Sequence, residues 1–127
     1  METNIRNKCK AYTSLEQSKK LAEILPLESA DMYYHYTTSV VKNYHEDIPN
    51  IIQLNNHFAF FNDDVPCWSL AALLSALPYT SLHETFSGWR CDSYNKEGTS
   101  CILGVPADNP VDACYEMILK LHELYLL

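Results

Sequence analysis

The chain has 127 residues, of which 47% are hydrophobic and 20% are charged. This length suits a single domain with one moderate core, and the composition excludes an intrinsically disordered chain. Sixteen acidic residues against nine Lys and Arg give a formal net charge of −7. Proteins bind phosphate backbones mainly through clustered Lys and Arg, so this balance argues against a nucleic-acid partner.

The cysteines indicate a reducing environment. There are five of them, at positions 9, 67, 91, 101 and 114. No pair has the C-x-x-C spacing, and an odd number leaves one thiol over in any disulfide framework. The first twelve residues contain no apolar run, and no stretch approaches transmembrane length. The sequence therefore predicts a cytoplasmic protein without a membrane partner.

A polar stretch precedes the first helix signal. Residues 1–12 are polar and predict a flexible N-terminal tail. Thr13-Ser-Leu-Glu16 has the spacing of a capping box, with the threonine as the cap and the glutamate three residues later. We therefore expect a helix over residues 14–25, which Pro26 ends.

The next forty residues predict strands and connectors. Residues 27–30 form a connector, and residues 31–38 are rich in aromatic and β-branched side chains, which favours a strand. Residues 48–54 fit either a short edge strand after Pro49 or a packed loop. Residues 57–61 predict another strand, and residues 62–64 a turn.

Pro66 is expected to begin a second helix over residues 66–77. Its apolar stripe is Leu70, Leu73, Leu74 and Leu77, and Pro78 ends it. From Thr85 the pattern changes to a two-residue alternation, and a turn at residues 95–98 predicts a hairpin with residues 99–105.

Two registers are possible for this hairpin. One pairs Cys91 with Cys101 and Trp89 with Leu103, which gathers the apolar side chains on one face. A slip of one residue places Trp89 opposite Gly104 and breaks that face. We prefer the first register.

Residues 109–127 carry the strongest helix signal. Asn109 can cap the helix, Pro110 fits the first position, and Asp112 favours the helix dipole in the first turn. An apolar stripe follows at steps of three and four residues: Val111, Cys114, Met117, Ile118, Leu121, Leu124 and Tyr125. We expect this face to pack against the 66–77 helix and the Trp89 hairpin.

Two sets of residues are candidates for function. Cys67 at the expected start of a helix is a candidate nucleophile, because a helix N-terminus lowers the pKa of a thiol. Trp68 would line a pocket beside it; the alternative is a cysteine buried where the helix enters the core. Tyr33, Tyr34 and Tyr36 form a possible recognition patch, although alternating strand positions usually place one set of side chains inside.

Sites for metals and cofactors are not predicted. The five histidines have no H-x-x-x-H or H-E-x-x-H spacing, and no Cys and His residues follow zinc-finger spacing. With three glycines, at positions 88, 98 and 104, neither a P-loop nor a dinucleotide fingerprint can form.

About half of the chain resembles a known family. The segments 17–26, 28–32, 66–74 and 108–114 are similar to short uncharacterised proteins from gut Bacteroidetes and their mobile or phage-derived elements. The resemblance implies a bacterial cytoplasmic setting and a phage connection. It implies no activity, cofactor or catalytic residue.

The sequence as a whole predicts an α+β fold in a single small domain. We expect an antiparallel sheet of about four to five strands, with two to three helices packed mainly on one face. The expected function is a non-catalytic accessory or protein-interaction role, with a homodimer through the tyrosine strand as one form of it. The alternative is a small-ligand-binding protein or enzyme with a pocket near Cys67 and Trp68.

Overall fold

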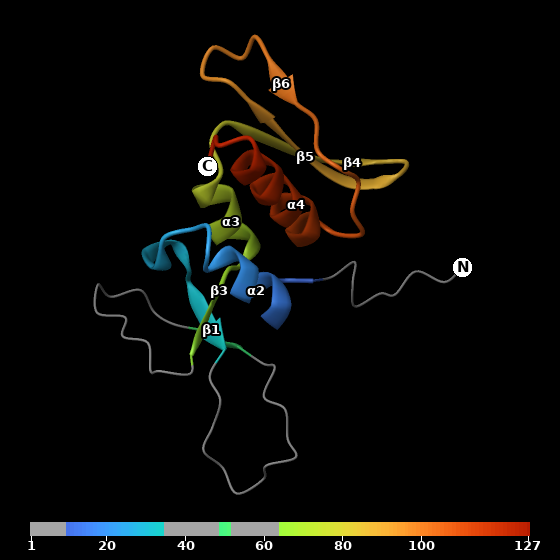
Figure 1. Cartoon of the computed structure of the whole chain (residues 1–127). Coiled ribbons are helices and arrows are strands. Elements are labelled where there is room, and N and C mark those ends of the chain that lie inside the picture. The colour runs from blue at the N-terminus through green and yellow to red at the C-terminus, as the bar shows by residue number, and fades with distance from the viewer. Residues whose placement is uncertain (1–9, 35–48, 52–63) are drawn as a thin grey trace, which may run out of the picture.

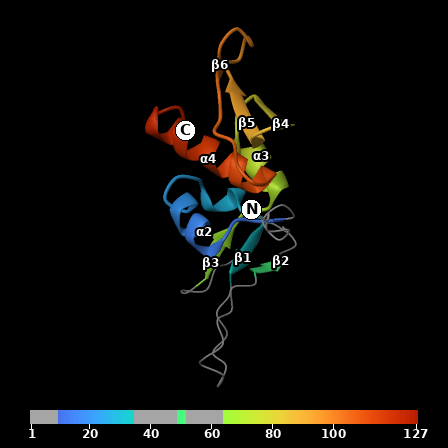
Figure 2. The ribbon, with the colours of Figure 1, turned by 90° about the vertical axis from the view of Figure 1, so that its right-hand side faces the viewer.

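The computed structural model describes residues 10–34, 49–51 and 64–127. Within these ranges, two small antiparallel sheets lie at opposite ends, with three helices between them (Figures 1 and 2). In chain order the elements are α2 (Leu15–Leu21), the 3-10 turn η1 (Leu27–Ser29), β1 (Met32–Tyr34), β2 (Pro49–Ile51), β3 (Val65–Cys67), α3 (Leu70–Ala76), β4 (Thr80–Thr85), β5 (Gly88–Tyr94), β6 (Cys101–Ile102) and α4 (Pro110–Glu123).

Helix α2 confirms the first predicted helix but corrects both of its ends. Ser14, not Thr13, is the N-cap, and its capping box is completed by Gln17 in place of Glu16. The helix ends at Leu21 and is followed by turns up to Pro26. The expected flexible tail is also too long, because Lys10 makes side-chain bonds and Tyr12 pairs with Ser69 in a β-bridge.

The lower sheet has the order β2-β1-β3. Strand β1 confirms the first part of the strand predicted over residues 31–38, and β2 confirms an edge strand at Pro49. The strand expected over residues 57–61 lies outside the described residues. The predicted start of the second helix is wrong, since Pro66 lies in β3 opposite Tyr33 of β1. Helix α3 begins at Leu70, after the cap Ser69, and Asp31 accepts hydrogen bonds from that serine.

The upper sheet has the order β4-β5-β6, and β4 was not foreseen. Both proposed hairpin registers are wrong: Tyr94 pairs with Cys101, and Ser93 pairs with Ile102. Gly104 therefore lies over Cys91, so close that a Cβ on it would be 2.1 Å from the Cys91 carbonyl oxygen. Gly88, with φ of +126°, is in equally tight contact with Ala107, where a Cβ would be 2.4 Å from the carbonyl oxygen.

Helix α4 is the centre of the main core, as expected. Asn109 caps it through the Asp112 N–H, and Pro110 occupies its first turn. It packs against α3 and β5, which confirms the predicted partners. The buried face is Val111, Ala113, Cys114, Met117, Ile118 and Leu121. The predicted stripe stops there, because Leu124 and Tyr125 are exposed.

The α+β class is confirmed, with helices packing on antiparallel strands. The strands divide between two sheets where one was expected. One continuous hydrophobic cluster still joins the two halves, since Leu21 and Trp68 share it with Cys91 and Ile118. In the parts of the chain described, no helix is both long and apolar enough to cross a membrane.

Candidate functional site

Cys67 and Trp68 lie in the core, which removes the grounds for their predicted roles. Cys67 is the last residue of β3 and not the first of a helix, so no helix N-terminus lowers its pKa. Both side chains are 0% exposed. Burial raises the pKa of the Cys67 thiol, which opposes the reactive thiolate. The Trp68 indole N–H donates to the Ser29 hydroxyl at 2.9 Å and so faces inward.

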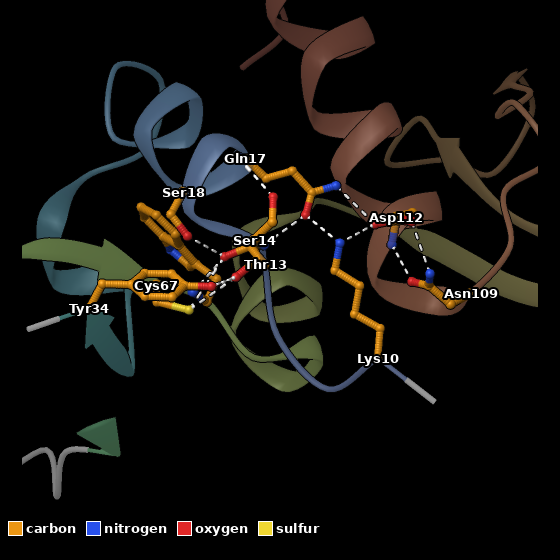
Figure 3. A network of polar contacts seen from close by, with 10 residues as sticks. Lys10, Thr13, Ser14, Gln17, Ser18, Tyr34, Cys67, Asn109 and Asp112 are labelled. Atoms are coloured by element: carbon orange, nitrogen blue, oxygen red, sulfur yellow. Dashed lines mark hydrogen bonds and ion pairs between the residues drawn. The ribbon is translucent and has the colours of Figure 1, made fainter. Parts of the chain in front are cut away.

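A buried polar network centred on Thr13 surrounds Cys67 (Figure 3). The Thr13 hydroxyl is 2.7 Å from that of Ser18 and accepts the Trp68 backbone N–H at 3.2 Å. The Thr13 carbonyl accepts from the Tyr34 hydroxyl at 2.7 Å and from the Cys67 thiol at 3.4 Å. Each of these groups has a partner within the protein, so the network joins α2 to the lower sheet.

The tyrosine patch is divided by the fold. Tyr34 is buried, with its ring edge-on to Tyr12, so it is a core residue and not the surface contact that was expected. Tyr33 alternates with it and is half-buried. Tyr36 lies outside the described residues. Alternating strand positions therefore place Tyr34 inside the protein, which is the second of the two possibilities given for the tyrosines.

A second polar network joins the N-terminal segment to α4. Lys10 donates to Asp112 at 2.8 Å and to Gln17 at 2.8 Å, and Gln17 also donates to Asp112 (Figure 3). Burial of Asp112 alone would raise its pKa. The bonds from Lys10, Gln17 and Asn109 outweigh that effect, so the pKa lies below its usual value. The aspartate thus holds the cap residue Asn109 in place and ties α4 to α2.

Strands β4 and β5 carry a polar cluster of Ser81, His83, Arg90 and Asp92. Asp92 is 2% exposed, and its carboxylate accepts from the Arg90 guanidinium at 3.0 and 3.2 Å and from the Gly104 N–H at 2.9 Å. Burial alone would raise its pKa, but these donors and nearby His83 hold it below the usual value. The alternation along residues 89–94 predicts the strand that carries Arg90 and Asp92. The sequence does not predict β4, so the cluster that the two strands form together is not predicted either.

This cluster places a serine, a histidine and a carboxylate in series. The Ser81 hydroxyl is 3.4 Å from His83 Nδ1, and His83 Nε2 is 3.6 Å from Asp92. Both distances exceed the 2.6–3.2 Å expected of a nucleophile and its base. Arg90 already occupies both carboxylate oxygens. The arrangement therefore supports pairing of β4 with β5 better than it supports catalysis.

Thiol chemistry is limited by burial in the rest of the fold as well. Cys91 on β5 and Cys114 on α4 are both 0% exposed and touch each other in the core. The contact with Cys91 and burial raise the pKa of the Cys114 thiol. Cys101 at the start of β6 is exposed. Among the residues that the structure describes, no group of three His, Cys, Asp or Glu side chains is placed to hold a metal.

A pocket of about 300 Å³ opens between the upper sheet and the end of α4. Neither Cys67 nor Trp68 is among its lining residues. Aromatic, aliphatic and polar side chains form its wall: Pro78, Tyr79, Ser93, Tyr94, Asn95, Lys96, Ser100, Ile102, Leu121 and Leu126.

Large apolar side chains are exposed around the same end of the molecule. Tyr125 is 94% exposed, and Leu124 and Leu126 are about half exposed. Leu103, also about half exposed, is held near the last turns of α4 because Lys120 donates to its carbonyl at 2.9 Å. We call these four residues the C-terminal apolar surface.

We compared the chain with known protein families, with curated proteins and with solved structures, and none of them matches it.

Proposed function

We propose that the protein is a non-catalytic protein-interaction module that binds its partner through the C-terminal apolar surface. The observation that carries the proposal is the exposure of Leu103, Leu124, Tyr125 and Leu126 at one end of the molecule. Large apolar side chains exposed near one another are typical of interaction sites on soluble proteins. A tyrosine among them adds a side chain that is frequent in binding hot spots.

The charges around this surface fit a protein partner. Lys120 and His122 lie in the last turn of α4, and Glu123 follows directly. An apolar centre with charged residues beside it is the usual anatomy of a protein–protein contact. A bacterial cytoplasmic setting and a phage connection are part of this proposal, and they rest on the composition and the family resemblance.

Quantitative affinity capture from a bacterial host lysate tests the proposal. The bait is the full chain, compared with a Leu124→Ser/Tyr125→Ser double variant. A Glu116→Ser variant is the matched control, because Glu116 is exposed on the same helix but lies outside the apolar surface. All three should give the same circular dichroism spectrum.

We expect the wild type and the control to capture one protein in stoichiometric amount. The double variant should not capture that protein. Equal capture of the same proteins by all three baits would overturn it. Direct titration of the purified partner then gives the dissociation constant. Loss of a hot-spot tyrosine is expected to weaken it by about 2 kcal/mol, roughly 30-fold.

A further inference from the structure

The outer edge of β4 is the longest strand edge in the described parts of the chain. In the order β4-β5-β6 the strand pairs on one side only within the described residues, where it forms the outer edge of the upper sheet (Figure 2). The other edge strands are shorter, with two residues in β6 and three each in β2 and β3. Strands β2 and β3 also contain Pro49 and Pro66, and proline and short length both prevent edge-to-edge pairing. Strand β4 has six residues and no proline, so neither protection is present.

The hydrogen-bond pattern shows which residues of β4 face outward. Tyr94 N donates to the Tyr79 carbonyl at 2.7 Å, which makes them a hydrogen-bonded pair. Such pairs alternate along an antiparallel ladder, and the β4–β5 register is continuous. The backbone groups of Ser81 and His83 therefore point toward β5. Those of Thr80, Leu82 and Glu84 point away from the sheet and form the outer edge.

We propose that this edge pairs with β4 of a second copy of the chain, antiparallel, about a two-fold axis at Leu82. Leu82 then lies opposite Leu82 of the second copy, and Thr80 lies opposite Glu84. Each of these pairs exchanges two N–H···O=C bonds. The inference rests on the proposed interaction role and adds a partner for a second surface, which adjoins the C-terminal one at Leu126.

The exposure of Phe86 supports a second copy over an unrelated strand. Phe86 is fully exposed at the β4–β5 turn, four residues after Leu82. Pro78 lies four residues before Leu82. The two-fold axis therefore brings Phe86 of one copy opposite Pro78 of the other. Pro78 and Tyr79 also line the pocket of about 300 Å³, so the contact with Phe86 of the second copy would border that pocket.

Sterics and charge are compatible with this pairing. Helix α4 packs mainly on β5, and the β5 strands of the two copies would be three strand spacings, about 14 Å, apart. Two packed helices need an interaxial distance of 8–10 Å, so the helices do not collide. Glu84 faces Thr80, and His83 faces Ser81 of the second copy, so like charges are not directly opposite.

Two substitutions at Thr80 test the register. Thr80→Lys places a cation opposite Glu84 of the second copy and should strengthen the dimer. Thr80→Glu places like charges opposite each other and should weaken it. Each change acts twice by symmetry, so we expect shifts in the dimer dissociation constant of about 2- to 30-fold in opposite directions.

Substitutions at Glu84 test the backbone edge. Glu84→Pro removes an outward N–H without touching the β4–β5 ladder, and it should abolish the dimer. Glu84→Thr keeps the N–H and is the matched control, which should dimerise like the wild type. Sedimentation equilibrium of the full chain gives the dissociation constants, and thermal unfolding confirms that each variant is folded.

The outcomes separate this inference from the proposed function. A wild type that is monomeric up to about 1 mM would overturn the dimer. Equal dissociation constants for the two Thr80 variants, or an unaffected Glu84→Pro dimer, would exclude this edge. None of these results changes partner capture by the C-terminal apolar surface. Conversely, loss of capture with Leu124→Ser/Tyr125→Ser leaves the β4 dimer intact.

Discussion

Replacing Thr13 by Val tests whether the buried polar network fixes the lower half of the fold. The two side chains have nearly the same shape, but valine lacks the hydroxyl. The Trp68 backbone N–H would lose its acceptor in a site that is 0% exposed. Ser18, which is 2.7 Å from the hydroxyl, can still turn to a backbone carbonyl of its own helix.

The expected loss follows from the group left without a partner. One buried unsatisfied N–H costs about 1–3 kcal/mol of unfolding free energy. Thr13→Ser keeps the hydroxyl and loses one methyl group, which costs about 0.8 kcal/mol. Tyr34→Phe removes a donor, but the Thr13 carbonyl keeps the Cys67 thiol, so we expect about 0.5–1.5 kcal/mol.

Urea unfolding followed by tryptophan fluorescence measures these losses, because Trp68 is fully buried in the native state. Hydrogen exchange of the Trp68 amide gives an independent reading, and it should speed up in the valine variant alone. If Thr13→Val is no less stable than Thr13→Ser, or if its loss is below about 0.5 kcal/mol, the hydroxyl does not support the fold.

Three further outcomes follow from the core, the carboxylates and the thiols. Ile118→Ala should cost about 2–5 kcal/mol in chemical unfolding, whereas Leu124→Ala on the exposed side should cost less than about 0.5 kcal/mol. The pKa values of Asp92 and Asp112 are lower in the folded than in the unfolded chain. Their stabilisation is therefore complete above about pH 4 and is lost as the pH falls through the folded values; Asp112→Asn should flatten that acid-unfolding curve. Under mild alkylation of the native protein, Cys101 should react ahead of the three buried cysteines of the described residues, and early labelling of Cys67 would contradict its burial.

The final helix could be predicted because its signals are local. Asn109, Pro110 and Asp112 act within one turn, and the stripe from Val111 to Leu121 needs only a core to face. The predicted apolar stripe extends too far at the C-terminal end of the helix, and the cause is equally simple. Leu124 continues the helical period, but it follows the last helical residue, Glu123, at a position that the described parts of the chain leave about half exposed.

The second helix was misplaced because Pro66 is compatible with two structures. Proline suits both the first turn of a helix and an edge strand. Pairing of β3 with β1 decides for the strand, and the sequence does not reveal that pairing. Because Cys67 belongs to a strand, no helix N-terminus lowers the pKa of its thiol. The cap Ser69 was a local signal that could have located the true start.

The predicted hairpin registers are wrong because the loop between β5 and β6 is longer than the turn predicted at residues 95–98. Gly98 suggested that the turn ends there, but Asn95 N donates to the Ser100 carbonyl, and the Asn95 side chain accepts from Thr99 and Ser100. The asparagine thus organises a loop up to Ser100 and shifts the pairing. Strand β4 is formed by pairing with β5 over all six of its residues, and the sequence does not reveal that pairing.

Polar residues whose predicted roles lie within one helix or one tail hold distant parts of the chain together. Asp112 was expected only to favour a helix dipole, and Lys10 only to belong to a tail. Their ion pair spans 102 positions in sequence and shares Gln17, which completes the capping box of α2. The start of α2 and the start of α4 are therefore fixed by one network. Because α4 also carries the upper sheet, this contact sets the lower sheet in place relative to β4 and the C-terminal apolar surface. An Asp112→Ala change should accordingly lower the unfolding free energy of both halves. The β4 edge shares no residue with the network, so it should still pair with β4 of a second copy.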